Sequence, residues 1–402
     1  MSAIDVAAER DLTPGVRGHV FLDSAGSSLP PTPVVEAMVG HLRREAEVGG
    51  YRAALERLDD LERLPVAIGR LLGVDAATVA LTDSATRSWT QFVAGLHLGP
   101  GDRVLLAGNE YASNAIALLQ QARLRGVEVD VVPSDPDGSG PIDLAALARA
   151  LERPTRLVSL VHVPTNTGTV APVAEAARLA RASGALVVLD ACQAMGQLDV
   201  RLDGDPDGLA VDAVSATGRK WLRGPRGTGF LHVRAGLLEQ LEPFGADLRA
   251  GEWTTPDTYR LRADARRFEQ WEHDVAARLG LLVAVEHLLD LGPAAVEAAV
   301  RSRAASLRTL LGDLPGVTLH DRGTDLAGIV TFTVDGREPE EVRDALRERG
   351  VTVSVSGRGS TLLDMTERGL RAVVRASPHY FVDDADLDRA AGEVAALTRA
   401  GV

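Results

Sequence analysis

The stretch that decides the fold is Ala185-Leu-Val-Val-Leu-Asp190, which is followed by Ala191-Cys-Gln193. A short apolar run that ends on a carboxylate is typical of a strand buried in a parallel sheet. Ligands of open α/β sheets bind outside the carboxyl ends of the strands. The pattern therefore predicts an α/β fold with Asp190 and Gln193 as candidate site residues.

Six further short apolar runs lie around this strand and alternate with segments of helical periodicity. Such alternation predicts a mostly parallel, seven-stranded sheet covered by helices on both faces. The expected strands are Val79–Thr82, Arg103–Ala107, Glu128–Pro133, Leu157–His162, Leu186–Asp190, Ala213–Ser215 and Gly229–Val233. The expected helices include Ser88–Leu96, Asn114–Arg125, Leu144–Leu151 and Val173–Ser183.

The alternation ends near residue 245, and the rest of the chain predicts a smaller α+β domain. We expect an N-terminal arm over 1–20, a large domain over 21–250, a connecting long-helix region over 251–290 and a small C-terminal domain over 291–402. The expected elements beyond 270 are helices Val275–Leu289, Ala294–Leu311, Glu338–Arg349 and one from Asp384, and strands Ile329–Val334, Val351–Val355 and Leu370–Ala376.

Lys220 is the only lysine among 43 basic residues. Arginine replaces lysine wherever a positive charge suffices, so a single remaining lysine indicates chemistry that a guanidinium cannot perform. A lysine amine can lose its proton and act as a nucleophile, whereas arginine stays protonated. Lys220 follows the expected strand at 213–215, and Asn166 follows the one at 157–162. Both therefore lie at the edge of the sheet where Asp190 is expected.

Composition excludes several classes of protein. The net charge of −13 disfavours nucleic acid as a partner. The single cysteine excludes an intramolecular disulfide and a multi-cysteine metal site, and we expect no metal. No uncharged apolar run reaches the roughly 18 residues that would span a membrane. We therefore expect a soluble, cytoplasmic protein without a membrane partner.

Several motifs, taken in order, resemble the class V aminotransferase family of pyridoxal phosphate enzymes. They are Leu22-Asp-Ser-Ala-Gly26, Glu110-Tyr-Ala-Ser-Asn114, Asn166-x-Gly-x-Val170, Asp190-x-x-Gln193, Gly218-Arg-Lys220 and Val374-Arg-Ala-Ser-Pro378. The resemblance spans about residues 20 to 395. It implies a fold type I architecture in which the large domain binds the cofactor, and a homodimer whose active sites lie near the subunit interface.

The resemblance assigns the cofactor contacts residue by residue. It makes Lys220 the Schiff-base lysine and the base that moves the substrate α-proton, and it makes Asp190 the partner of the pyridinium nitrogen. Gln193 and Asn166 match residues near the phenolic oxygen of the cofactor. Tyr111 lies in the segment that supplies a ring stacked on the cofactor, although core packing would explain it equally well. The residues that match the phosphate site are Ala85, Thr86 and Thr217, with Ser215 as a weaker alternative to Thr217.

The substrate-binding residues follow from the same resemblance. Arg375 matches the arginine that grips the α-carboxylate of an amino acid substrate, and a planar guanidinium suits bidentate binding of that group. Tyr51 and Arg52 lie in the N-terminal segment that lines the substrate entrance in this family.

The chain departs from the cysteine desulfurases of the family at three places. The segment 354–361 lacks their mobile nucleophilic cysteine, and we expect Cys192 to be a small buried apolar residue. Arg219 stands where a histidine often precedes the lysine. The segment Arg267–His273 lacks the usual Gly-Thr contact to the partner's phosphate group.

The reaction we expect is cleavage of a cysteine S-conjugate. The segments 47–51 and 218–222 resemble those of β-lyases from ergothioneine-type and lincosamide pathways. Elimination would release the thiol, pyruvate and ammonia. Two alternatives stay open: a transaminase, epimerase or decarboxylating enzyme that uses the same cofactor, and a non-catalytic module that only binds pyridoxal phosphate.

Overall fold

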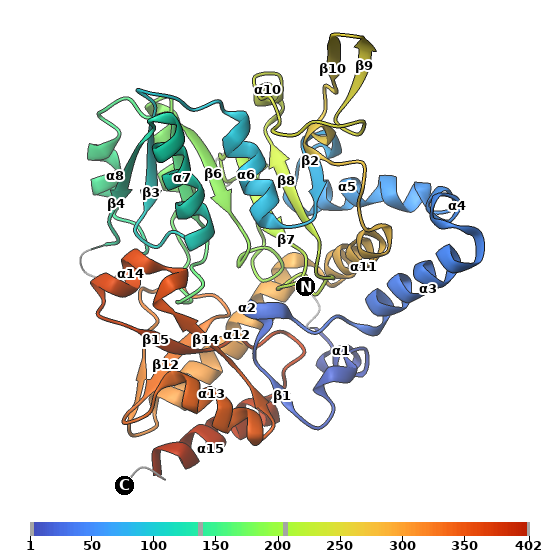
Figure 1. The fold of residues 1–402 in the computed structure, drawn as a ribbon. Coiled ribbons are helices and arrows are strands. Elements are labelled where there is room, and N and C mark those ends of the chain that lie inside the picture. Colours follow the sequence, from blue (N-terminus) through green and yellow to red (C-terminus); the bar gives the residue numbers. More distant parts are fainter. Residues whose placement is uncertain (1–3, 136–139, 204–207, 400–402) are drawn as a thin grey trace.

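A seven-stranded sheet forms the centre of the molecule in the computed structural model, which describes residues 4–135, 140–203 and 208–399 (Figure 1). Its order is β2-β8-β7-β6-β5-β3-β4, and β8 alone runs antiparallel to its neighbours. This confirms the predicted mostly parallel sheet. The strands are β2 (Val79–Thr82), β3 (Arg103–Ala107), β4 (Glu128–Val132), β5 (Leu157–Val161), β6 (Leu186–Asp190), β7 (Ala213–Thr217) and β8 (Gly229–Val233).

Helices cover both faces of this sheet, which explains why its central strands are almost entirely buried and mostly apolar. In β6, Val187 and Leu189 belong to one core cluster, whereas Val188 between them belongs to the other. Successive side chains of a strand point to opposite faces, so each face needs its own apolar layer. The helices are α8 (Leu144–Ala150) and α9 (Val173–Ala182) on the first face, and α6 (Ala85–Gly95) and α7 (Ala112–Arg125) on the second.

The C-terminal third forms the predicted α+β unit around a four-stranded antiparallel sheet, β11-β12-β15-β14. The short edge strand β11 was not predicted. The strands are β11 (Val317–Leu319), β12 (Val330–Val334), β14 (Ser354–Gly357) and β15 (Ala372–Ala376). The helices are α12 (Pro293–Gly312), α13 (Pro339–Glu348), α14 (Leu362–Glu367) and α15 (Asp384–Arg399).

The N-terminal segment is attached to this C-terminal unit. Strand β1 (Val20–Phe21) pairs in parallel with β13 (Val351–Thr352), and α1 (Val6–Asp11) places Arg10 next to Asp383 and Asp386. Residues 1–3 of the expected arm lie outside the described residues. The predicted domain boundaries stay predictions.

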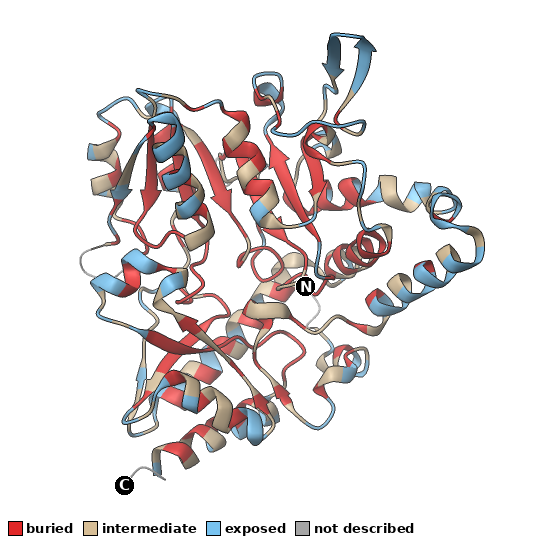
Figure 2. Cartoon of the chain, viewed as in Figure 1, coloured by how far each residue is buried: buried red, intermediate tan, exposed pale blue. Residues whose placement is uncertain are grey.

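Three helices and a hairpin extend away from the sheet (Figures 1 and 2). Helix α3 (Thr32–Val48) and α5 (Leu58–Leu72) both pack on α11 (Val275–Leu291), while the short α4 (Gly50–Leu55) joins them at the far end. The hairpin of β9 (Gly251–Thr255) and β10 (Thr258–Leu261) is exposed along almost its whole length. Neither this hairpin nor the helices α3 to α5 were predicted from the sequence.

Within the described ranges, no single helix is long and apolar enough to cross a membrane. Helices α11 and α12 meet the length and composition criteria only as a pair, and that pair is bent by 84°.

Candidate active site

A cavity of about 110 Å³ lies at the carboxyl ends of β5, β6 and β7. The sheet places Asp190 and Lys220 there as predicted, because parallel neighbours end at one edge. The lining residues are Ser84, Ala85, Thr86, Tyr111, Asn114, Val161, Val163, Thr165, Asp190, Cys192, Gln193, Thr217, Arg219 and Lys220.

Lys220 reaches the cavity from the loop that follows β7. Burial lowers the pKa of its amine, and the nearby positive charges of Arg219 and Arg375 lower it further, while Cys192 and Asp190 act in the opposite direction. A lower pKa increases the fraction of neutral amine, which is the nucleophilic and basic form. The environment of Lys220 therefore favours the chemistry that its uniqueness in the sequence indicated.

Asp190 is buried at the end of β6 with two fixed donors. Its Oδ2 accepts a hydrogen bond from Asn114 Nδ2 at 2.9 Å, and its Oδ1 accepts one from the backbone N–H of Cys192 at 2.9 Å. Donors of this kind stabilise a carboxylate and fix its orientation. Asp190 can therefore present a defined negative charge to a ligand in the cavity.

Cys192 has intermediate exposure and lies on the cavity wall, whereas a small buried apolar residue was expected. The residue follows the strand end by two positions, where the chain turns along the edge of the site. Burial and the charge of Asp190 raise the pKa of its thiol well above the usual value. A thiol in this environment stays protonated and is a poor nucleophile.

Gln193 and Thr165 form the next part of the wall. Gln193 Nε2 donates to the carbonyl of Ala25 and to Thr165 Oγ1, at 3.0 and 3.2 Å, while its Oε1 accepts from Trp221 Nε1 at 2.9 Å. Asn166 was expected here, but it is not among the lining residues: its Nδ2 donates to Asp364 at 2.6 Å, and its buried Oδ1 has no partner among the described residues. The structure therefore places Thr165, rather than Asn166, beside Gln193.

The N-terminus of α6 forms another side of the cavity through Ser84, Ala85 and Thr86. The first backbone N–H groups of a helix lack intrahelical acceptors and suit a phosphate group. Gly229 lies against this turn, since a Cβ there would come within 2.8 Å of the nitrogen of Ala85. Thr217 lines the same cavity, whereas Ser215 Oγ donates to the carbonyl of Ala85 at 3.0 Å and braces the helix from outside the lining.

Tyr111 also lines the cavity and is 37% exposed. It is the residue immediately before α7, and its backbone N–H donates to Glu110 Oε1 at 2.8 Å. An aromatic ring in this position is available to a ligand rather than enclosed in the core.

Arg375 lies just behind the lining residues, on β15 of the smaller unit. Its Nη1 donates to Thr165 Oγ1 at 2.6 Å, its Nε donates to Ser354 Oγ at 3.1 Å, and its Nη2 pairs with Asp23 Oδ1 at 3.3 Å. Burial lowers the pKa of its guanidinium. The positive charge therefore borders the cavity through Thr165.

Tyr51 and Arg52 are not brought to the cavity of their own chain. Both lie on α4 at the tip of the protruding helices, where Tyr51 is 81% exposed and Arg52 is exposed as well (Figures 1 and 2).

Several site residues had no role in the sequence analysis. Glu110 and Asn114 occur in a quoted motif, and their spacing of four across the start of α7 would have indicated side chains on one face. Arg219 was noted only as a departure from the desulfurases. Thr165 lies one position before Asn166, and no separate signal in the sequence pointed to it.

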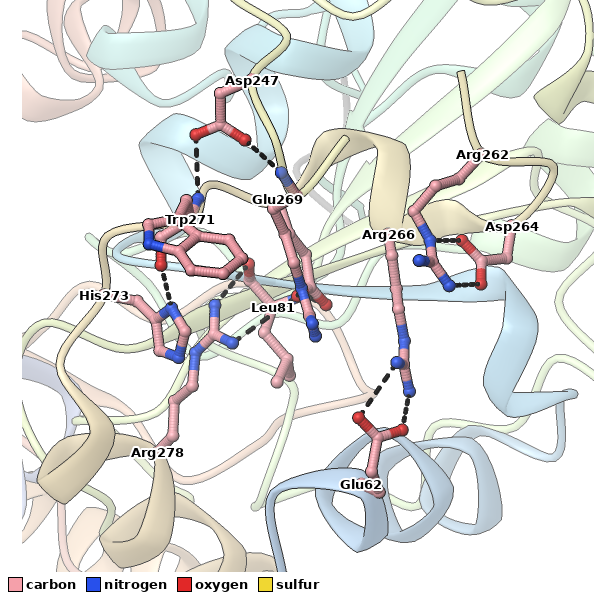
Figure 3. Close-up of polar contacts among 11 residues, drawn as sticks. Glu62, Leu81, Asp247, Arg262, Asp264, Arg266, Glu269, Trp271, His273 and Arg278 are labelled. Atoms are coloured by element: carbon pink, nitrogen blue, oxygen red, sulfur yellow. Dashed lines mark hydrogen bonds and ion pairs between the residues drawn. The ribbon is translucent and has the colours of Figure 1, made fainter. Parts of the chain in front are cut away.

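The segment in which the usual Gly-Thr contact is missing is fixed to the edge of the sheet (Figure 3). The buried carboxylate of Glu269 accepts from the backbone N–H of Leu81 at 3.1 Å and pairs with Arg249 at 2.9 Å. Asp247 accepts from the backbone N–H of Trp271 at 2.8 Å, and the indole remains 52% exposed. This anchoring presents Trp271 at the surface.

Comparison with known proteins identifies the class to which this fold and site belong. A model of the aminotransferase class-V family matches residues 20–390, so the chain belongs to that family. The match confirms the predicted family, the fold type and an enzyme that uses pyridoxal phosphate.

Individual relatives are named for several activities. A probable hercynylcysteine sulfoxide lyase of Mycobacterium tuberculosis is 31% identical, over 97% of this chain and 93% of its own length. A probable cysteine desulfurase of Methanothermobacter thermautotrophicus is 28% identical, over 92% of each chain. A cystine C–S lyase solved with its product cysteine persulfide superimposes with a TM-score of 0.85 at 25% identity, covering 95% of this chain and 99% of its own.

Proposed function

We propose that this chain cleaves the carbon–sulfur bond of an S-substituted cysteine with pyridoxal phosphate. The substrate and one water give a thiol, pyruvate and ammonia. The observation that carries the proposal is the placement of the only lysine of the chain in one cavity with the carboxylate of Asp190. Relatives named for hercynylcysteine sulfoxide, cysteine and cystine support a substrate of the cysteine type.

The residues present fit the cofactor. The first turn of α6 and Thr217 would hold the phosphate, and Gly229 keeps that turn free of a side chain from β8. Asp190 would pair with the ring nitrogen. Gln193 would donate to the phenolic oxygen by exchanging one of the two acceptors of its Nε2, Ala25 or Thr165, for the cofactor. When bound, pyridoxal phosphate supplies an aldehyde for the substrate amine and an electron sink for the breaking Cα–H bond.

Lys220 and Arg375 would act on the substrate itself. Lys220 removes the α-proton, and the lowered pKa of its amine increases the neutral form that can accept it. The guanidinium of Arg375 binds the α-carboxylate and so orients the Cα–H bond toward the lysine. The electrons released at Cα then expel the sulfur from Cβ.

The position of Cys192 favours simple elimination over transfer of sulfur to the enzyme. A desulfurase needs a thiolate that attacks the substrate sulfur. Cys192 is the only cysteine, and burial and Asp190 keep its thiol protonated. The segment Ser354–Thr361 near Arg375 carries hydroxyl groups and no thiol. The sulfur therefore leaves with its substituent.

We also propose that the chain works as a homodimer. Apolar side chains are exposed in clusters on the protruding helices and around the hairpin β9–β10, which is typical of an unpaired interface. Sedimentation equilibrium of the purified protein at micromolar concentration should give twice the chain mass, and a monomer mass would contradict the proposal. The exposed side chains include Val35, Leu42, Tyr51, Leu55, Phe244, Leu248, Trp253 and Trp271.

Product analysis tests the proposed reaction. The protein reconstituted with pyridoxal phosphate would be incubated with S-alkylcysteines and their sulfoxides. We expect equal amounts of pyruvate and ammonia, with free thiol from the S-alkylcysteines. Lys220→Ala should reduce turnover by at least about a thousandfold, because the base is removed. Lys220→Arg is the matched control that keeps the charge, and it should be as inactive.

Other products would overturn the lyase proposal in favour of the alternatives. Amino transfer that depends on a keto acid indicates a transaminase, exchange of the α-hydrogen with inversion indicates an epimerase, and release of carbon dioxide indicates a decarboxylating enzyme. Cofactor binding without turnover of any amino acid in a broad panel indicates a binding module.

A further inference from the structure

Glu110 is a buried carboxyl group next to the cavity, immediately before the lining residue Tyr111 in the sequence. It lies between β3 and α7, it is 3% exposed, and it is absent from the lining. Burying a carboxyl group in a protein interior is unfavourable unless donors surround it. The contacts of Glu110 show what this group holds in place.

Three donors converge on Glu110. Its Oε1 accepts from Asn114 Nδ2 at 2.9 Å and from the backbone N–H of Tyr111 at 2.8 Å, and its Oε2 accepts from Ser159 Oγ at 2.6 Å. These partners come from the start of α7 and from β5. Glu110 therefore joins the sheet to the segment that supplies the exposed ring of Tyr111.

The amide of Asn114 extends this network into the site. The same Nδ2 that donates to Glu110 also donates to Asp190 Oδ2 at 2.9 Å. An amide nitrogen has two hydrogens, and here each is directed to one carboxyl group. The side chain of Asn114 is buried, which strengthens both contacts. Moving Glu110 would therefore release the donor that fixes Asp190.

The energetics of the pair agree with such a coupling. Burial raises the pKa of Glu110 to about 7, and the charge of Asp190 contributes in the same direction, while Ser159, Asn114 and Tyr111 lower it. Two carboxyl groups joined by one amide are held near each other at an energetic cost. An arrangement with that cost implies a function at the site rather than general packing.

We propose that Glu110 is a positioning residue that fixes both Asp190, through Asn114, and Tyr111, through its backbone N–H, and thereby sets the affinity of the site for the ring of pyridoxal phosphate. This inference rests on the proposed function only for the identity of the cofactor.

The test compares cofactor binding in Glu110→Ala and Glu110→Gln, measured as quenching of tryptophan fluorescence on titration of the apoprotein. Glu110→Ala should raise the Kd of pyridoxal phosphate by at least about tenfold, the effect of losing one hydrogen bond to a charged group. Glu110→Gln should stay within about threefold, since its amide oxygen can still accept from Asn114 and Tyr111. Glu128→Ala, an exposed carboxylate on β4 paired with Arg153, is the control and should not change the Kd.

A double-mutant cycle separates positioning from general stability. If Glu110 acts through Asn114, adding Glu110→Ala to Asn114→Ala should raise the Kd by less than half as much as it does in the wild-type chain. Additive effects would overturn the coupling, and an unchanged Kd in Glu110→Ala would overturn the role itself. The absorption band of the bound cofactor gives a second readout. Its pH midpoint should shift in Glu110→Ala and remain in place in the Glu128→Ala control.

Two further outcomes keep the inference falsifiable. If Glu110→Ala does not fold, Asn114→Ala alone must weaken cofactor binding by about tenfold, and wild-type binding in that variant would overturn the inference. Failure of the wild-type chain to bind pyridoxal phosphate would contradict the cofactor assignment. Binding without elimination would contradict only the proposed reaction and would leave this test in place.

Discussion

The guanidinium of Arg375 has three partners before any substrate arrives. The hydroxyl oxygens of Thr165 and Ser354 accept hydrogen bonds from its Nη1 and Nε, and the carboxylate of Asp23 pairs with its Nη2 at 3.3 Å. A substrate carboxylate would therefore compete with Asp23 for one edge of the guanidinium. Such an arrangement keeps a buried positive charge compensated in the free enzyme.

Replacing Arg375 should affect substrate binding more than the chemical step. We expect Arg375→Lys to raise KM for the amino acid about 10- to 100-fold with a smaller change in kcat, because a lysine cannot reproduce a bidentate contact. Steady-state kinetics with one S-alkylcysteine would measure this. The matched control is Arg371→Lys, an exposed residue immediately before β15, and it should leave both constants unchanged. A loss confined to kcat would contradict the assignment.

Thr165 and Asn166 offer a direct test of which neighbour serves the site. Thr165→Val should raise KM several-fold, since it removes the hydroxyl that joins Gln193 and Arg375. Asn166→Ala should lower stability by about 1–3 kcal/mol through its buried contact to Asp364, with kinetics of the folded enzyme near wild type. Kinetic and urea-unfolding measurements on both variants would show the contrast. A raised KM in Asn166→Ala with unchanged kinetics in Thr165→Val would show that Asn166, and not Thr165, serves the site.

These residues also show the extent to which the site could be predicted from the sequence. Asp190 and Lys220 follow apolar strands, so strand periodicity alone places them at one sheet edge. The distinction between Thr165 and Asn166 depends on the turn that follows β5, which local composition does not define. Glu110 is a charged residue whose burial becomes evident only when β5 and α7 pack around it.

At the level of elements, the junction of α6 and β8 forms the proposed phosphate site. Gly229 opens β8 where the strand passes the first turn of α6, and a Cβ there would come within 2.6 Å of the carbonyl carbon of Ser84. The strand can approach the helix only without a side chain.

Gly229→Ala should separate these two elements. We expect at least a tenfold weaker Kd for pyridoxal phosphate and a loss of about 1–3 kcal/mol in stability, the usual range for overpacking. The control is Gly392→Ala within α15, where no atom lies within 4 Å of the added Cβ. That change should be neutral or should stabilise by up to about 1 kcal/mol. Unchanged cofactor binding in Gly229→Ala would contradict the proposed phosphate site.

The strands buried on both sides were predicted with nearly the bounds that they have in the structure. Strands such as β5 and β6 contact an apolar layer on each face and therefore read as continuous apolar runs. The hairpin β9–β10 has side chains exposed on both faces, so neither periodicity nor composition marked it. Helix α3 carries apolar residues on a side that the single chain leaves uncovered, including Val35 and Val39.

On the scale of the whole molecule, buried histidines determine the response to acid. Burial lowers the pKa of His162 and His232 to about 4 and that of His379 to about 3. In the unfolded chain these groups bind protons near pH 6.5, before the folded form does. Their contribution to stability is therefore fully present above about pH 6.5 and is lost as the pH falls toward 4.

The expected loss is about 3 kcal/mol for a histidine whose pKa falls from about 6.5 to about 4. Glu110 acts oppositely over part of this range, because its raised pKa lets the folded form bind a proton first. Three histidines lose stability as the pH falls, whereas only Glu110 gains it. The urea midpoint of unfolding should therefore fall steeply between pH 6.5 and 4.5. His162→Gln should make this dependence shallower, whereas His19→Gln, at a less buried position, should not. A urea midpoint that does not change with pH in the wild-type chain would contradict the role of the buried histidines.

The parallel pairing of β1 with β13 has a consequence for synthesis on the ribosome. Val20 and Phe21 are translated before the strands of the central sheet, whereas their partners Val351 and Thr352 are translated after them. The nascent chain must therefore carry an unpaired edge past the exit tunnel while the central sheet is already complete. Closure of the smaller unit around this strand can therefore begin only after residues 351 and 352 have left the ribosome.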